Sequence, residues 1–514
     1  MTPKDLVIGI DSSTTACKAI AWDKTGRAAA EARATYPMFS PAPNRYEQRA
    51  EDWWTALCEV VRSVVSQVGS DRIAAVCVTN QRETFVPVDE RGSAVRNAIV
   101  WLDDRSRNEL QDLDRLVGLD KIQDLTGKGP ATVQPISKFI WLQKYEPDVI
   151  KRTHKFVEAH AFLVKRLTGK WMTSLASADP MGVVDMRRGA WADDLIKTIG
   201  LKPEQFVEIM PPGSVIGELT SDAAEETGLP AGTLVVAGAG DGQCAGLGAN
   251  ITHAGKAYLN LGTAMVSGAF SETYIANRAF RTLCSPIYGA FVPEEVLPAG
   301  TFTVSWFVEQ FGPDMRGLNL PLSAEEVLEV AAAKLPPGAM GLMLVPYWGG
   351  VMPPYWDPAA TGITIGWTGA HRREHFYRAL LEGIAYEHRL AMDEVAKAIG
   401  VPFEEFILMG GGSRSALWCQ IVADVTGQKV TRAGSAEATN LGAAILSAAA
   451  VGWYDSVRNA ADAMTTTGRS FFPNEQAHRI YDRLYREVYM HIFPALKTYS
   501  DRLTSLTHDI DSAE

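Results

Sequence analysis

The stretch that decides the fold is "LVIGIDSSTTACKAIAWDKTGR", residues 6–27. An apolar run ends in Asp11, four small hydroxyl residues follow over 12–15, and a second apolar run begins after Lys18. Two such runs joined by a short polar turn predict a β-hairpin. Its N–H groups and hydroxyls can cradle phosphate oxygens, and an aspartate at the strand end can hold Mg²⁺. A polar hairpin whose hydroxyls bond only their own backbone explains this stretch at least as well.

Three further turns rich in glycine follow predicted strands: "AGAGDG" (237–242), "NLGT" (260–263) and "GGGS" (410–413). The last one precedes a predicted helix, so its N–H groups and the helix dipole favour an anion. Each turn alone is explained equally by tight strand–helix geometry, and Asp241 by a plain helix N-cap. Together they predict two lobes that close on a nucleotide, with an acid near the reacting end.

Two other nucleotide-binding motifs are not supported. A P-loop requires GxxxxGK[ST], and "TGKGP" (126–130) lacks both the spacing and the hydroxyl residue after lysine. The run "GAGDGQCAGLG" (238–248) resembles GxGxxG, but Gln243 stands where the third glycine belongs. Neither a P-loop ATPase nor a Rossmann dehydrogenase is therefore expected.

Short β-rich runs alternate with helical segments throughout, which predicts α/β architecture. The first hairpin and "AYLNLG-TAMVSGAF" (257–270) share one plan about half a chain apart, which indicates two similar halves. We place their boundary near 245–255. The predicted domains are 1–250 and 251–500, with a polar tail over 501–514.

Composition excludes several classes of protein. The net charge of −11 argues against a broad nucleic-acid surface. No run of ~18 apolar residues suggests a membrane span, and the start lacks the apolar segment of a signal peptide. Six cysteines without a CxxC pair suit reduced thiols in a cytosol. We expect a cytoplasmic protein without nucleic-acid or membrane partners.

Asp11-x-x-Thr14-Thr15, "NLGT", "GGGSRSALWCQIVADVTG" (410–427) and "EATNLGAAILSAAAVG" (437–452) occur in this order. In combination they resemble the FGGY carbohydrate kinases of the actin, hexokinase and chaperone ATPase superfamily, over roughly residues 6–495. The resemblance implies two ribonuclease-H-like (actin-like ATPase) α/β domains with a cleft between them. In it, the first domain (1–250) binds the sugar and the second (251–500) binds the nucleotide. It also implies ATP with Mg²⁺ as cofactor, a small sugar or polyol as acceptor, and a homodimer, since dimers are common in the family.

The resemblance also implies roles for individual residues. In it, Asp241 is the general base, Asp11 holds Mg²⁺, and the segment "TNQRET" (79–84) contacts the substrate. The implied ATP contacts are Ser13, Thr14, Thr15, Lys18, Gly262, Thr263, Gly411, Gly412 and Ser413, and the implied substrate contacts are Arg82, Glu83, Trp101, Asp241 and Gln243. Two plainer interpretations stay open: Trp101 as an ordinary core residue and Arg82–Glu83 as a structural ion pair.

The substrate signals conflict. "NQRET" and "IVWLDDRS" resemble glycerol kinases, but Val133 and Gly242 stand where those enzymes carry tyrosine and glutamine. The run 410–427 resembles xylulokinases, which typically carry a Met-His pair where this chain has Arg82–Glu83. We expect a kinase for a pentulose such as xylulose, with a glycerol- or erythritol-type polyol kinase as the alternative.

Three other functions remain to be separated from a sugar kinase. An acetate-kinase-like enzyme would not need the Arg82–Glu83 grip on a diol. An actin- or chaperone-like ATPase without a sugar substrate usually carries a separate partner-binding region, and nothing beyond residue 500 is long enough for one. A degenerate sugar sensor is disfavoured because Asp11 and Asp241 are both present.

Overall fold

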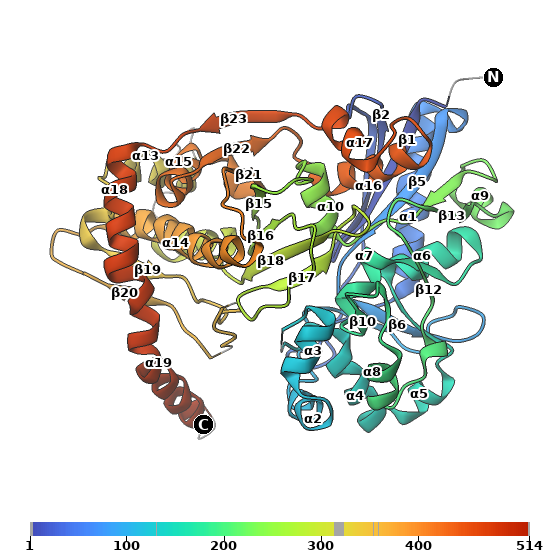
Figure 1. The fold of residues 1–514 in the computed structure, drawn as a ribbon, viewed down its shortest axis with the longest axis horizontal. Coiled ribbons are helices and arrows are strands. Elements are labelled where there is room, and N and C mark those ends of the chain that lie inside the picture. Colours follow the sequence, from blue (N-terminus) through green and yellow to red (C-terminus); the bar gives the residue numbers. More distant parts are fainter. Residues whose placement is uncertain (1–3, 130, 313–322, 353, 358, 512–514) are drawn as a thin grey trace.

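A computed structural model describes residues 4–511, except 130, 313–322, 353 and 358. The chain forms two α/β lobes, each built around one mixed sheet (Figure 1). The blue-to-green half of the chain forms most of the first lobe, and the yellow-to-red half forms most of the second. In the part of the chain that is described, no helix is long and apolar enough to cross a membrane. All six cysteines are buried and free.

The first sheet has the strand order β13-β14-β5-β1-β2-β3. The predicted hairpin is β1 and β2, which pair antiparallel with Asp11 opposite Lys18. β5 runs parallel to β1, and β14 runs parallel to β5. The bounds are β1 (Leu6–Ser12), β2 (Ala16–Asp23), β3 (Ala28–Thr35), β5 (Ile73–Asn80), β13 (Val215–Glu218) and β14 (Leu234–Val236).

The second sheet, of order β17-β18-β16-β15-β21-β22-β23, repeats this plan. β15 and β16 form an antiparallel hairpin, and β21 and β22 continue the sheet in parallel, as β5 and β14 do in the first lobe. The two hairpins predicted to be related thus occupy equivalent positions. The bounds are β15 (Lys256–Leu261), β16 (Met265–Ala269), β17 (Arg281–Cys284), β18 (Phe291–Leu297), β21 (Glu405–Met409), β22 (Lys429–Ala433) and β23 (Thr467–Phe471).

Helices cover both faces of the first sheet. On one face lies α1 (Ala50–Val68), whose apolar residues recur at helical spacing and which ends at Gly69, with α6 (Ala159–Thr168) beside it. On the other face lies α16 (Ala438–Ala450), although it belongs to the second half of the chain. The first lobe therefore completes its core with a helix that follows β22.

α16 and α10 (Asp241–Gly248) lie between the two sheets, because residues of α10 enter the cores on both sides. Glycines allow these two helices to approach closely. A Cβ on Gly442 would lie 2.1 Å from the Cys244 carbonyl oxygen, and one on Gly248 would lie 1.9 Å from that of Ala438. The predicted boundary near 245–255 falls at the end of α10 and in the segment before β15.

The second sheet is covered by α14 (Arg373–Ile399) and α15 (Ala416–Thr426), with α11 (Thr301–Phe311) and α13 (Ala324–Ala332) further out. α18 (Glu475–Leu484), a π-helical turn over 485–489 and α19 (Met490–Asp511) form one nearly continuous rod along this lobe (Figure 1). α19 continues into the tail predicted over 501–514.

Shorter elements complete the two lobes. Those of the first lobe are β4 (Glu47–Gln48), β6 (Phe85–Val88), β7 (Ala98–Ile99), α2 (Glu109–Leu116), α3 (Leu119–Thr126), α4 (Pro135–Tyr145), α5 (Pro147–Arg152), β8 (Lys155–Glu158), β9 (Met172–Ser174), α7 (Leu175–Ala178), β10 (Val184–Asp185), β11 (Ala190–Trp191), α8 (Asp193–Thr198), β12 (Glu208–Met210) and α9 (Ser221–Thr227). From the second half come β19 (Met343–Val345), β20 (Ile363–Ile365) and α17 (Val457–Met464).

Candidate active site

Three adjacent strands bring the candidate residues of the first lobe to one edge. β1, β5 and β14 run in parallel, Ser12 pairs with Asn80, and Asn80 forms a further bridge to Gly240. Asp11, the pair that follows β5 and the aspartate that follows β14 therefore meet at the carboxyl ends of the strands. In open α/β sheets this is the edge where ligands bind.

Local hydrogen bonds organise the β1–β2 turn. Ser13 Oγ donates to the Ala16 carbonyl oxygen over 2.9 Å, as expected for a hydroxyl that stabilises its own turn. Thr14 Oγ1 accepts from Trp101 Nε1 at 2.9 Å, and Thr15 is exposed. The carbonyl oxygens of Thr14 and Thr15 accept from Gln48 Nε2 and from the Tyr36 N–H, and a contact of the two residues with phosphates stays a prediction.

The ammonium of Lys18 is held by two carboxylates. It lies 2.8 Å from Glu437 Oε1, just before α16, and 3.1 Å from Glu31 Oε2 on β3. A phosphate would have to compete with both. The pair with Glu437 also shows that the start of α16 lies against the predicted phosphate hairpin. The role of Lys18 stays a prediction.

Asp11 has the character of a cation ligand. Its Oδ1 is buried and has no hydrogen-bond partner among the described residues. Burial and, to a smaller extent, the charges of Asp241 and Glu437 together raise the pKa of Asp11 to about 8, although Lys18 lowers it. A cation would relieve this unpaired oxygen. In the described part of the chain, no group of three or more His, Cys, Asp or Glu residues could hold a metal, so Mg²⁺ would need water and phosphate ligands as well.

Asp241 is the first residue of α10. Its Oδ1 accepts from the Gly242 N–H at 2.7 Å and lies 3.0 Å from Arg82 Nε. The side chain is 37% exposed, so a substrate can reach it. The positive end of the helix dipole favours a negative charge there. An accessible carboxylate held by a guanidinium can accept a proton from a hydroxyl.

The Arg82–Glu83 pair is built into a buried network that joins the lobes. Arg82 Nη1 donates to both oxygens of Glu294, each at 2.9 Å, and Arg281 Nη1 donates to Glu83 Oε1 at 2.8 Å. Glu83 has a φ of 58°, a left-handed conformation that costs about 1–3 kcal/mol outside glycine and concentrates at functional sites. The two residues pair with the second lobe, so they are more than an ion pair at one strand end.

Trp101 is not an ordinary core residue. Its side chain is 36% exposed and its indole donates to the phosphate hairpin, as described above. Lys138 fixes the backbone of this segment, because its buried ammonium donates to the carbonyl oxygens of Val100, Trp101 and Val133. Desolvation lowers the pKa of Lys138 to about 8. Trp101 is thus positioned to form a wall beside the hairpin.

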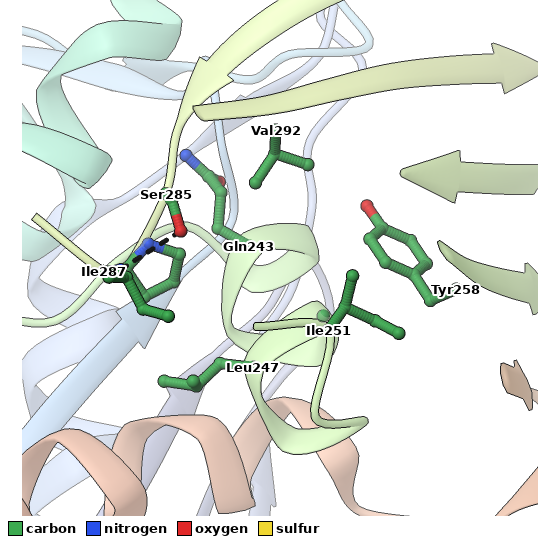
Figure 2. Close-up of a pocket in the computed structure, with 9 residues that line it drawn as sticks. Gln243, Leu247, Ile251, Tyr258, Ser285, Ile287 and Val292 are labelled. Carbon is green, nitrogen blue, oxygen red and sulfur yellow. Dashed lines mark hydrogen bonds between the residues drawn. The ribbon is translucent and has the colours of Figure 1, made fainter. Parts of the chain in front are cut away.

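The side chain of Gln243 forms its hydrogen bonds within the protein. Its Nε2 donates to the Ala176 carbonyl oxygen at 2.8 Å and to Asp179 Oδ1 at 3.2 Å. Figure 2 shows this side chain on the wall of a small cavity that Tyr258 and Val292 also line. Two residues along a helix correspond to about 200° of rotation, so Gln243 leaves α10 on a different side from Asp241. A substrate contact by Gln243 stays a prediction.

The candidate turns of the second lobe lie against each other. Gly262 and Thr263 connect β15 to β16, and Thr263 is exposed. Gly410 precedes the 3-10 turn Gly411–Arg414 and has a φ of 81°; a Cβ there would lie 2.4 Å from Asn260 Oδ1. Gly411 has open space around it, and Ser413 Oγ donates to the Gly410 carbonyl oxygen. The predicted adenosine and phosphate turns therefore share one edge.

Sequence reasoning missed four residues of this region. Glu294, Arg281 and Tyr258 complete the network around Arg82, and Asn440 of α16 donates to the carbonyl oxygens of Gly9 and Lys18. One signal was available for Glu294: two adjacent carboxylates interrupt the otherwise apolar strand "FVPEEVL" over 291–297. Nothing in the sequence indicated which arginines pair with Glu294.

Comparisons with known proteins agree with this arrangement. The model of the FGGY family of carbohydrate kinases, N-terminal domain, matches residues 6–248, and that of its C-terminal domain matches 257–451. The xylulose kinase of Bacillus subtilis (strain 168) is 28% identical over 96% of this chain and 99% of its own. The gluconokinase of Bacillus licheniformis is 24% identical over 93% of this chain and 94% of its own.

Among solved structures, the xylulose kinase from Rhodospirillum rubrum superposes with a TM-score of 0.90 at 28% identity, covering 96% of this chain and 99% of that one. These matches confirm the predicted fold of two actin-like ATPase domains and the predicted phosphotransferase. They span both lobes and the edges on which the candidate residues lie. The chain therefore belongs to the FGGY family of carbohydrate kinases, and it is a sugar kinase.

Proposed function

We propose that this kinase transfers the γ-phosphate of ATP, with Mg²⁺, to a hydroxyl of a pentulose such as xylulose. The observation that carries the proposal is the exposed Asp241 carboxylate, 3.0 Å from Arg82 Nε at the start of α10. The name of the Bacillus subtilis relative supports xylulose as the acceptor. Kinases of the family use ATP, and the exposed turns at Thr14–Thr15 and Gly262–Thr263 offer backbone N–H groups and hydroxyls to its phosphates.

Phosphoryl transfer leaves the protein mainly positioning and charge stabilisation. In this proposal Asp241 takes the proton of the attacking hydroxyl at a carboxylate oxygen, a contribution of typically ~10²–10⁴-fold. Glu83, whose Oε1 accepts from Arg281 Nη1, accepts from a neighbouring hydroxyl of the acceptor at its other oxygen. Trp101 excludes water beside the hairpin.

Asp11 fits Mg²⁺ because its buried Oδ1 lacks a partner. Mg²⁺, when bound with ATP, neutralises charge on the phosphate oxygens. Lys18 would add a second cation if ATP draws its ammonium away from Glu31 or Glu437. Closing of the two lobes would exclude water, which otherwise attacks ATP.

A glycerol- or erythritol-type polyol is the second candidate acceptor. The Arg82–Glu83 pair favours it, because an arginine and a carboxylate can bind a diol in any acyclic polyhydroxyl compound. Gly242, which stands where glycerol kinases carry glutamine, does not decide the length of the acceptor, because the Arg82 guanidinium takes the space beside it. A homodimer and a cytoplasmic location, which the six buried thiols suit, remain proposals that light scattering and fractionation can test.

The test is ADP release with Mg-ATP against D-xylulose, L-xylulose, D-ribulose, L-ribulose, glycerol, erythritol, xylitol, ribitol and D-gluconate, with Asp241→Asn as the blank. We expect strong stimulation by one ketose, absent in the blank. Stimulation by glycerol or erythritol alone would select the second candidate. Hydrolysis that is equal in both proteins and independent of any sugar would overturn the proposal.

A further inference from the structure

Four charged side chains from both lobes form one buried group beside Asp241. Arg82 and Glu83 follow β5 in the first lobe, whereas Arg281 and Glu294 belong to β17 and β18 in the second. All four are at most 8% exposed. Buried charges persist only when paired, so the group is a built feature.

Glu294 is the centre of this group. It accepts from Arg82 Nη1 on both oxygens, from Arg281 Nε at 2.8 Å and Nη2 at 2.6 Å, and from the Tyr258 hydroxyl at 2.6 Å. Burial alone would raise the pKa of Glu294, but the two guanidiniums and the hydroxyl lower it to about 2. Glu294 is therefore ionised at neutral pH, and its negative charge attracts Arg82 toward the second lobe.

Two glycines on either side of Asp241 make room for Arg82. A Cβ on Gly240 would lie 2.5 Å from Arg82 Cγ, and one on Gly242 would lie 2.8 Å from Arg82 Nη2. The guanidinium thus lies flat against the segment that presents Asp241. Its position is set by that segment on one side and by Glu294 on the other.

Within this group, each guanidinium is paired with carboxylates. The two guanidiniums of Arg82 and Arg281 face three carboxylates, Asp241, Glu83 and Glu294. With all three ionised, the formal sum is −1. A substrate carboxylate entering this region would meet a net negative charge and no unpaired arginine, whereas a neutral polyol would meet hydrogen-bond acceptors.

We propose that Glu294 and Arg281 are specificity-determining positioning residues of the sugar site, which together make it select uncharged polyhydroxyl acceptors and reject sugar acids. This inference rests on the proposed function, in which Arg82 and Glu83 face the acceptor. It matters because a gluconokinase, whose name implies an acidic acceptor, is among the relatives of this chain.

The test compares a neutral acceptor with the aldonate of the same chain length. The neutral acceptor is the best compound of the panel above, and the aldonate is assayed as a competitive inhibitor against it. The measured quantity is the ratio of the aldonate's inhibition constant to the KM of the neutral acceptor. Glu294→Gln removes one negative charge and releases Arg82, so we expect this ratio to fall at least tenfold. Arg281→Met removes a positive charge, so we expect the ratio to rise at least threefold.

Glu382→Gln is a matched control. Glu382 is also buried in the second lobe and accepts from Arg378 Nε and the Tyr481 hydroxyl, each at 2.7 Å, but it belongs to α14, outside the site. We expect it to lower the melting temperature as Glu294→Gln does and to leave the ratio unchanged. If Glu294→Gln does not fold, the sign of the Arg281→Met effect decides alone.

Opposite shifts of this ratio in the two variants cannot arise from destabilisation, because destabilisation would act in the same direction in both variants. A ratio that stays within twofold in every folded variant of an active enzyme would overturn the inference and leave the proposed function standing. So would a wild-type enzyme that binds the aldonate more tightly than the neutral compound. A wild-type enzyme that phosphorylates no sugar would overturn the proposed function, and the inference with it.

Discussion

Replacing Glu387 with glutamine should change how the stability of the second lobe depends on pH. Glu387 lies on α14, is 3% exposed, and accepts from the hydroxyls of Tyr347 at 3.0 Å and Tyr489 at 2.5 Å. Desolvation raises its pKa from 4.5 to about 7, although these two hydrogen bonds lower it. Burial raises the pKa of Glu295 as well, and the charge of Glu387 adds to that rise.

The sign follows from the direction of this pKa change. Below about pH 4.5 the carboxyl is neutral in both states, and between about pH 4.5 and 7 it ionises only in the unfolded chain. The unfolded state then binds fewer protons, so stability falls as pH rises. Each pKa unit corresponds to about 1.4 kcal/mol, so the rise from 4.5 to about 7 corresponds to about 3 kcal/mol lost by pH 7.

Glu387→Gln keeps an oxygen that can accept from both tyrosines and removes the titration. We expect the variant and the wild type to be equally stable near pH 4.5 and the variant to be more stable by about 3 kcal/mol at pH 8. Urea unfolding at half-unit pH steps measures this difference. The variant also lacks the Glu387 charge that raises the pKa of Glu295, and this change stabilises the variant at high pH in the same direction. A difference that does not change with pH, or a variant that is less stable at pH 8, would refute the reasoning.

Three further predictions concern the helix crossing and the nucleotide edge. Gly442→Val should lower the free energy of unfolding by at least about 2 kcal/mol, because even a Cβ there would lie 2.1 Å from the Cys244 carbonyl oxygen. Gly369→Ala is the control, since Gly369 has open space around it and this change should hardly affect the free energy of unfolding. Urea unfolding compares the two variants. Asp11→Asn should raise the Mg²⁺ concentration needed for half-maximal transfer at least tenfold and leave the KM of the sugar nearly unchanged. An unchanged Mg²⁺ titration would show that Asp11 is not a ligand of the metal. Trp101→Phe keeps an aromatic side chain of smaller size and loses the donor to Thr14, so it should lower kcat/KM up to about tenfold. A value equal to wild type would show that this hydrogen bond does not contribute to catalysis.

Much of this site could be predicted from sequence because its parts are local. Asp11, Gly262 and Gly410 each end a short apolar run, and in parallel α/β sheets the ends of such runs meet at one edge. The similarity of the two halves could also be predicted from a local pattern, because each half opens with a strand, a small-residue turn with threonine and a second strand.

The partners of the charged residues could not be predicted in this way. Arg82 meets Glu294 across 212 residues of chain, and Lys18 meets Glu437, which follows β22. These pairs depend on how the lobes pack, which no local pattern encodes. Gln243 illustrates a related limit: the sequence alone does not show that its amide donates to the Ala176 carbonyl oxygen and to Asp179.

The most direct test of the central claim is transfer of labelled phosphate from γ-labelled Mg-ATP to D-xylulose and the other ketoses by the wild type and by Asp241→Asn. We predict a labelled sugar phosphate from the wild type and a yield at least ~10²-fold lower from the variant, with sugar binding retained in calorimetry. Near-normal transfer by Asp241→Asn would contradict the assignment of the base. Labelled inorganic phosphate alone, in equal amounts from both proteins, would contradict the sugar-kinase account itself.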